Sequence, residues 1–144
     1  MKALIQRVTS SSVEVDGTNV GQINKGLLVF IGIEKLDELS HADKMINKIL
    51  SYRVFSDAND KMNLSVSDIN GDVLLVPQFT LAADTKNGTR AGFSTAMKPI
   101  EAENIYDYML EKFKTYLNIQ SGVFGADMKV SLVNDGPVTF LLEC

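Results

Sequence analysis

The stretch GLLVFIGI, residues 26–33, is an unbroken apolar run. A strand that is exposed on one face alternates apolar and polar residues, whereas a strand covered on both faces reads as a continuous apolar segment. The run is also far too short to cross a bilayer as a helix. It therefore predicts the central strand of a sheet, and the rest of the chain has to supply the layers that cover it.

The residues before this run predict two more strands and a hairpin. Residues 2–9 favour one strand, and residues 12–15 favour a second. Asp16-Gly17 is typical of a tight turn, and it leads into a strand over residues 19–23. The N-terminal part of the chain is therefore expected to be mostly β-structure.

The residues after the run predict a helix that covers one face of the sheet. Ser40, followed by Asp43, resembles a capping box at a helix N-terminus. A short strand over residues 52–55 is expected next. The buried side of the helix is marked by apolar residues at helical spacing: Ala42, Met45, Ile46, Ile49 and Leu50.

A further strand and the second helix are predicted in the middle of the chain. Residues 72–76 predict a strand, and Pro77 marks an edge, a bulge or the end of it, because proline cannot donate to a ladder. Pro99 suits the first turn of a helix. The buried stripe of that helix is expected to be Tyr106, Met109, Leu110 and Phe113.

The chain closes with two β-rich runs, residues 128–133 and 138–142, separated by Asn134-Asp135-Gly136-Pro137. Gly and Pro are ordinary turn residues, so a plain turn is one interpretation of this separation. With no repeat and no linker, residues 1–144 predict a single α+β domain.

Composition narrows the classes of function. Apolar residues make up 45% and charged residues 22% of the 144, near the globular average. The net charge of −4 argues against a protein that holds nucleic acid mainly by neutralising phosphates over a broad face. The first residues lack the pattern of a secretory signal, so we expect a cytoplasmic protein with no membrane segment.

Few residues are suited to metal or nucleophilic chemistry. The chain has one cysteine, Cys144, and one histidine, His41, which is expected on a solvated helix surface. One of each cannot build a Cys/His metal site, and a Ser-His-Asp triad would have to recruit this histidine. A carboxylate-only metal site is compatible with the composition, although no paired spacing suggests one. Basic residues gather only around Lys86 and Arg90, which is usually the mark of a solvated loop.

Five strings stand out along nearly the whole chain: IQRV (5–8), SSVEVDG (11–17), GLLVFIGI (26–33), DKMNLSVSDINGDVLLVPQFTLAADT (60–85) and FGADMKVSLVNDGPVT (124–139). In this combination and order they resemble the D-aminoacyl-tRNA deacylase family, also called D-tyrosyl-tRNA deacylases. Two positions depart from the family pattern. Pro77 stands where the family usually has Ser, and the usual Arg-Pro-Ser-Phe reads Arg90-Ala91-Gly92-Phe93.

The resemblance implies a mixed, largely antiparallel, curled sheet packed with two main helices. It also implies an enzyme that hydrolyses the ester between a D-amino acid, or glycine, and the 3′-terminal ribose of tRNA, without metal or cofactor. Gln78, Phe79 and Thr80 would lie at the ester, with backbone N–H groups holding the oxyanion and the RNA 2′-hydroxyl assisting. Thr80 as a covalent nucleophile is a second interpretation.

The remaining site residues also follow from the resemblance. Phe124 and Met128 would stack against the terminal adenine, or be plain core residues, and Lys86 and Arg90 would meet acceptor-stem phosphates. A cis Gly136-Pro137 segment, braced by Arg7, would reject L-residues in the active site of the partner subunit of a homodimer. The alternative function is a non-catalytic module of the same fold that binds a nucleotide or an RNA end.

Overall fold

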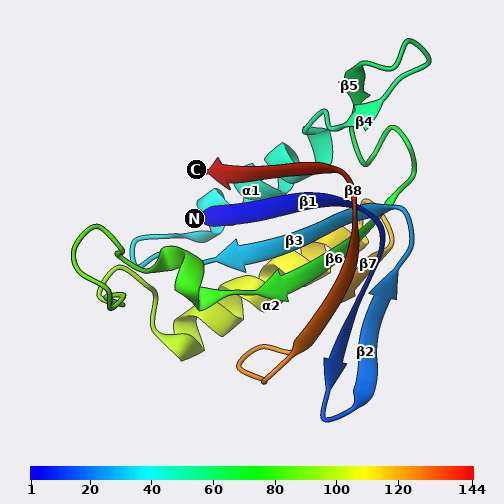
Figure 1. Cartoon of the computed structure of the whole chain (residues 1–144). Helices are drawn as coiled ribbons and strands as arrows, with labels where there is room; N and C mark the ends of the chain where they lie inside the picture. Colours follow the sequence, from blue (N-terminus) through cyan, green and yellow to red (C-terminus); the bar gives the residue numbers. More distant parts are fainter.

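Strand β3 (Gly26–Gly32) lies in the middle of the sheet, as the GLLVFIGI run predicts. The computed structural model describes residues 1–144 and places the strands in the order β2-β1-β3-β6-β7, with β8 also paired to β1 (Figure 1). The other elements are β1 (Lys2–Val15), β2 (Thr18–Ile23), α1 (Leu39–Ser51), β4 (Phe55–Ser56), β5 (Met62–Leu64), β6 (Asp72–Pro77), the 3-10 helix η1 (Phe79–Ala82), α2 (Pro99–Lys114), β7 (Ile119–Ser121) and β8 (Lys129–Glu143).

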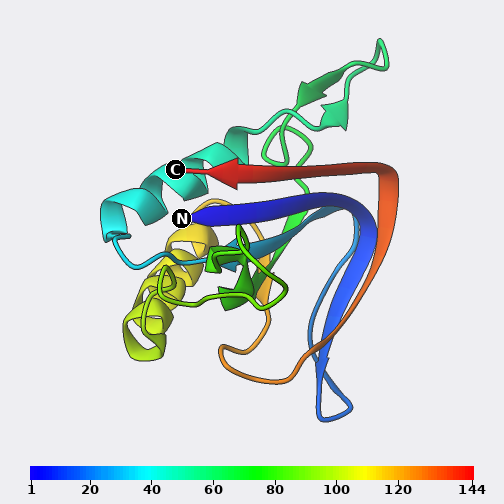
Figure 2. The same ribbon diagram turned by 60° about the vertical axis from the view of Figure 1, so that its left-hand side comes forward.

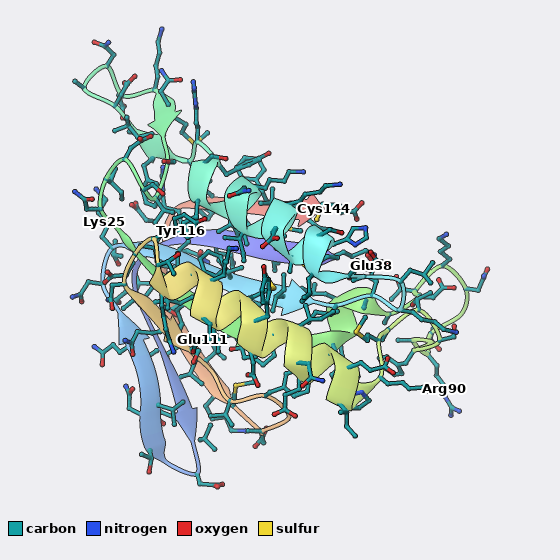
Figure 3. The ribbon with its side chains drawn as sticks, turned by 180° about the vertical axis from the view of Figure 1, so that it is seen from behind. Lys25, Glu38, Arg90, Glu111, Tyr116 and Cys144 are labelled. Atoms are coloured by element: carbon teal, nitrogen blue, oxygen red, sulfur yellow. The ribbon has the colours of Figure 1, made fainter.

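Alternate residues of β3 pack into two separate apolar cores, which explains why the run is unbroken. Leu27 and Val29 belong to a cluster of 23 buried residues that includes the inner faces of α1 and α2. Leu28 belongs to a second cluster of six buried residues contributed by strands alone. Both helices lie against one face of the sheet (Figure 3), so the larger core fills the space beneath them and the smaller core lies within the curl of the strands.

The sheet curls because its two longest strands bend together (Figure 2). The first half of β1 pairs with β3 and its last residues pair with β2, while β8 follows β1 along nearly its whole length. The β1, β2 and β8 pairs are antiparallel, whereas β3–β6 and β6–β7 are parallel. The predicted α+β fold, a mixed and largely antiparallel curled sheet with two main helices, is confirmed.

The two predicted breaks in the long strands are wrong. Residues 2–9 and 12–15 form one continuous strand, and the two C-terminal runs also form one strand, β8. Asn134-Asp135-Gly136-Pro137 makes no hairpin. Gln6 pairs with Thr139 and Val8 pairs with Asn134, so the extra residues of β8 bulge opposite Arg7 while β1 continues as the template.

The helices are predicted well on their buried faces and less well at one end. All five expected residues of α1 are buried, and α2 begins with Pro99 in its first turn. The capping box, however, is Glu38 with His41 rather than Ser40 with Asp43. Here Nδ1 of His41 accepts the Glu38 N–H at 3.0 Å, so this histidine has a structural role. Neither helix has both the length and the apolar character needed to span a membrane.

Two smaller predictions need correction. The strand expected over residues 52–55 is reduced to β4 (Phe55–Ser56), because α1 extends to Ser51 and Tyr52 forms its C-cap. Leu110 of α2 is only partly buried and packs at the edge of the larger core. By contrast, the expected turn at Asp16-Gly17 is present, since both residues have positive φ (48° and 76°).

Candidate active site

A cavity of about 740 Å³ opens at the carboxyl ends of the parallel strands β3 and β6. This end of parallel strands is a common ligand site, and the volume is in the range of small-molecule sites. Of its 18 lining residues, 13 are hydrophobic, so polar groups at its wall act in a poorly solvated environment. The lining includes Gln78, Phe79, Phe93, Lys98, Phe124 and Met128.

Gly32 allows the chain after β6 to lie directly against β3. A Cβ atom built on Gly32 would lie 2.7 Å from Cβ of Leu81 and 3.2 Å from the carbonyl oxygen of Gln78. The Gln78 N–H donates to the carbonyl of Ile31 at 2.8 Å. Strand β6 ends at Pro77 and η1 begins at Phe79. Close approach and hydrogen bonding together fix the backbone of residues 78–82, which follow the strand.

The backbone N–H groups of Phe79 and Thr80 have no acceptor within the chain. The next amides are paired, since Leu81 donates to Gln78 and Ala83 donates to Thr80. Unpaired donors in the first turn of a helix are the groups that bind anions in many proteins. Phe79 lines the cavity and Thr80 is the next residue, so these two donors are candidates for binding an oxyanion there.

The side chains of Gln78 and Thr80 contact each other. Nε2 of Gln78 donates to Oγ1 of Thr80 at 2.6 Å. Thr80 itself is exposed, and it does not line the cavity, whereas Gln78 does. The structure therefore brings the three predicted residues together, with the Thr80 hydroxyl turned to Gln78 and no histidine, carboxylate or lysine hydrogen-bonded to it.

Two phenylalanine rings meet at the cavity mouth, and the sequence does not predict their contact. The Phe79 and Phe93 rings lie 5.2 Å apart between centroids, and their side chains are 61% and 47% exposed. Phe93 ends the string Arg90-Ala91-Gly92-Phe93, and its proximity to Phe79 depends on the fold of the intervening loop. Backbone hydrogen bonds in both directions between Asp84 and Gly92, at 2.8 and 2.9 Å, close that loop.

Phe124 and Met128 also line the cavity and pack partly on the core. Phe124 lies against the larger cluster and Met128 against the smaller one, so each has a core contact, while stacking on the adenine stays a prediction. Tyr106 supports this wall: its ring contacts Phe124 with centroids 5.9 Å apart, and its hydroxyl donates to the Leu75 carbonyl at 2.9 Å. Burial raises the pKa of Tyr106 well above its ordinary value, so the phenol stays a neutral donor.

Lys98 is the only ionisable side chain in the cavity lining. Lys98 follows the basic stretch around Lys86 and Arg90 in the sequence, and the structure places it at the N-cap of α2. No three side chains of the His, Cys, Asp and Glu types come together in the structure in an arrangement that could hold a metal ion. The available polar chemistry of the cavity is thus backbone N–H groups, one amide side chain and one lysine.

Lys86 and Arg90 lie outside the cavity. Both are exposed on the loop that Asp84 and Gly92 close, and Arg90 extends from its outer end (Figure 3). Neither side chain makes an ion pair within the chain. The loop starts within a few residues of η1, so its charges are available to a ligand that extends beyond the cavity.

The Gly136–Pro137 peptide bond is cis, and Arg7 holds the segment that contains it. Nε of Arg7 donates to the Asp135 carbonyl at 2.9 Å, and Nη1 donates to the Val54 carbonyl at 2.6 Å. The Arg7 side chain is only 13% exposed. A side chain at Gly136 would be strained, because its φ is +128° and a Cβ would lie 3.0 Å from Nη2 of Arg7.

Within one chain, this segment lies at the other end of β3 from the cavity. Arg7, which contacts Asp135, pairs with Leu27 near the start of β3. Gln78 instead bonds to Ile31, four residues later on the same strand. At about 3.3 Å per residue, the two sites are roughly 13 Å apart along the strand direction alone.

Comparisons with known proteins agree over the length of the chain. A family model described as D-Tyr-tRNA(Tyr) deacylase matches residues 4–143. A D-aminoacyl-tRNA deacylase from Aliivibrio fischeri (strain MJ11) is 54% identical over 143 residues, and one from Pseudomonas fluorescens (strain Pf0-1) is 56% identical over 144 residues. Each alignment covers 99% of both chains.

Two solved structures have the same fold. One, titled c-Myc DNA Unwinding Element Binding Protein, has a TM-score of 0.96 and 42% identity, covering 100% of this chain and 99% of that one. The other, titled as a probable eukaryotic D-amino acid tRNA deacylase, has a TM-score of 0.87 and 15% identity, covering 98% and 97%, and shows the fold alone. By the family match and the full-length relatives, the chain belongs to the D-Tyr-tRNA(Tyr) deacylase family of enzymes.

Proposed function

We propose that this chain hydrolyses the ester that joins a D-amino acid, or glycine, to the 3′-terminal ribose of tRNA. One observation supports the chemistry most: two consecutive unpaired backbone N–H groups, of Phe79, which lines a mostly apolar cavity, and of the adjoining Thr80. An aminoacyl ester is already activated. Positioning and oxyanion stabilisation therefore account for much of what an enzyme must add.

In this mechanism, water adds to the ester carbonyl carbon and the carbonyl oxygen becomes the oxyanion. The N–H groups of Phe79 and Thr80 stabilise it as charge develops, at positions fixed by Gly32 and by the Gln78 N–H bond to β3. The tetrahedral intermediate then collapses, the bond from carbon to the ribose oxygen breaks, and the ribose oxygen takes up a proton. The neighbouring 2′-hydroxyl of the RNA assists proton movement, since no histidine or carboxylate lines the cavity.

A covalent route through Thr80 is less consistent with the geometry. Its hydroxyl oxygen accepts a hydrogen bond from Nε2 of Gln78, and an amide N–H cannot remove a proton from it. We therefore assign the Thr80 backbone, and not its side chain, to catalysis.

The proposed recognition of the terminal adenosine uses the wall formed by Phe124 and Met128. Single-stranded bases are commonly held by stacking on aromatic side chains. Phe124 is aromatic and supported from behind by Tyr106, while Met128 offers an adaptable apolar contact. Pro77, in place of the family's usual Ser, also lines the cavity, so this chain does without a hydroxyl at that position.

We further propose a homodimer in which Gly136-Pro137 enters the active site of the partner. Strand β8 pairs only with β1, so its other edge is open over residues 129–143. Val133, Phe140 and Leu141 are exposed along this strand, and a long apolar edge favours association. Since the segment is about 13 Å or more from Gln78 in its own chain, reaching an active site requires a second chain.

The test of the proposed function compares purified protein on D-tyrosyl-tRNA and L-tyrosyl-tRNA. We expect the D-ester to be cleaved about 100-fold faster, because forcing a side chain into a rigid wall costs about 3 kcal/mol. Release of labelled amino acid measures both rates. Equal rates on the two esters would contradict the stereospecific function, and loss of activity in EDTA, restored by a metal ion, would contradict a metal-free reaction.

The loop that carries Lys86 and Arg90 should affect only long substrates. Replacing both with Ala is expected to lower the affinity for tRNA several-fold and to reduce the slope of log K against log salt by up to about 2, because two phosphate contacts are lost. Fluorescence anisotropy over a salt series measures this. An unchanged slope would show that the loop is a solvated surface, and Lys25→Ala serves as the matched control.

A non-catalytic nucleic-acid-binding module is the second candidate. The 42%-identical solved structure is titled c-Myc DNA Unwinding Element Binding Protein, and this title is the observation that favours the second candidate. Such a module would bind the tRNA end without releasing amino acid, and it would bind both stereoisomers alike. The D-ester against L-ester comparison therefore separates the two candidates, while the expected cytoplasmic location stays a prediction.

A further inference from the structure

A second, smaller pocket of about 340 Å³ adjoins the proposed active site. It is lined by Lys35, Ser94, Ala96, Lys98 and Glu101, and it shares Ala96 and Lys98 with the main cavity. The main cavity is mostly apolar, whereas four of these five residues are polar or charged. Ala96 and Lys98, which line both, thus lie at the border between the apolar cavity and the polar pocket.

Backbone hydrogen bonds hold the two halves of this pocket together. The Lys35 N–H donates to the Thr95 carbonyl at 2.9 Å, and the Met97 N–H donates to the Ile33 carbonyl at 3.1 Å. A β-bridge joins Glu34 to Ala96 between them. The chain following β3 and the chain preceding α2 are therefore fixed side by side, with Lys35 paired to Thr95, and both Lys35 and Lys98 line the pocket between them.

The charges of the pocket favour an anion. Neither Lys35 nor Lys98 forms an ion pair within the chain, and both are exposed. Glu101 lines the same pocket but pairs with neither lysine, so the lining carries a net charge of one positive unit. Ser94 adds a hydroxyl that can donate a hydrogen bond.

We propose that Lys35, Ser94 and Lys98 bind the 5′-phosphate of the terminal nucleotide whose ester occupies the main cavity. The ribose that carries the ester also carries this phosphate, so the two groups are one sugar apart and need adjoining sites. The inference rests on the proposed function, and it names the part of the RNA backbone that the pocket recognises. It differs from the Lys86 and Arg90 proposal, which concerns phosphates farther along the tRNA.

The test uses two small substrates that differ only in this phosphate: the D-tyrosyl esters of adenosine and of adenosine 5′-monophosphate. In the wild type we expect the monophosphate ester to have the higher kcat/KM, by about two- to fivefold for each lysine contact. The Lys35→Ala variant should bring the ratio of the two kcat/KM values closer to one. Glu101→Gln should raise it, because a repelling charge is removed, and Lys25→Ala, at the far end of β3, should leave it unchanged.

The outcomes separate this proposal from the proposed function. A wild-type ratio near one, or a Lys35→Ala variant that keeps the wild-type ratio, would overturn the phosphate site while leaving hydrolysis itself established. Failure to hydrolyse either ester would contradict the proposed function, and the pocket is then judged by calorimetric binding of adenosine 5′-monophosphate against adenosine. Equal affinity for these two, or inorganic phosphate binding as tightly as the monophosphate, would overturn the assignment to a nucleotide.

Discussion

The Gly32→Ala variant is expected to lower kcat for D-aminoacyl-tRNA hydrolysis by about 100-fold. The added methyl group would lie 2.7 Å from Cβ of Leu81 and 3.2 Å from the Ala82 nitrogen and the Gln78 oxygen, so η1 has to move away from β3. That movement displaces the N–H groups of Phe79 and Thr80, and loss of one oxyanion donor costs about 10²–10³ in kcat. The effect should appear in kcat more than in KM, because these donors act mainly in the transition state.

Matched variants show whether the position of η1 is the cause. Gly92→Ala adds the same methyl group near the site, but its nearest contacts are 3.9 Å away, so it should keep its activity. Thr80→Ala should also keep measurable turnover and form no acyl-enzyme, because only its backbone acts. Adding Leu81→Gly to Gly32→Ala removes the closest contact and should restore part of kcat.

Single-turnover kinetics, with thermal unfolding to confirm that each variant is folded, measures these effects. A Gly32→Ala protein that is folded and fully active would refute the fixed-backbone mechanism. A trapped ester on Thr80 in the wild type would establish the covalent route instead.

The sequence predicts the sheet and the helix faces well because each depends on local pattern and burial. The GLLVFIGI run is unbroken since its two faces meet different cores, and the α1 stripe follows from helical spacing alone. The continuity of β8 could not be predicted, because Gly and Pro normally end a strand. Here the neighbouring strand β1 continues past them, and a bulge opposite Arg7 absorbs the extra residues.

The site is predictable only where its residues lie in one string. Gln78, Phe79 and Thr80 are consecutive, and the family resemblance predicts them as site residues. Phe93, Lys98 and Lys35 reach the cavity or its border because the chain after η1 folds back and pairs with the chain after β3. No local pattern encodes that contact, so these residues are found only once the tertiary structure is known.

The Arg7→Ala variant is expected to lower the D/L ratio of kcat/KM by about tenfold or more, mainly because the L-ester is cleaved faster. Arg7 ties the Asp135 carbonyl to the Val54 carbonyl, and such charged hydrogen bonds contribute about 1.5–3 kcal/mol each. Without them the Gly136-Pro137 segment loses its rigid position, and the proposed wall, once it can move, would no longer exclude an L side chain. A change of about 1.4 kcal/mol in this exclusion is a factor of ten.

Mixed dimers show which subunit supplies the wall. A dimer of one Gly32→Ala chain and one Arg7→Ala chain, purified through two different tags, has a single active catalytic site, on the Arg7→Ala chain. If the segment enters the partner's site, that active site faces an intact segment, and the mixed dimer should recover a D/L ratio close to the wild type. If each chain supplies its own wall, the mixed dimer should discriminate as poorly as the Arg7→Ala homodimer. Recovery requires contact between subunits, because roughly 13 Å along β3 separates Gly136-Pro137 from Gln78 within either chain. A mixed dimer that stays unselective would therefore refute both the trans arrangement and the filter built on it.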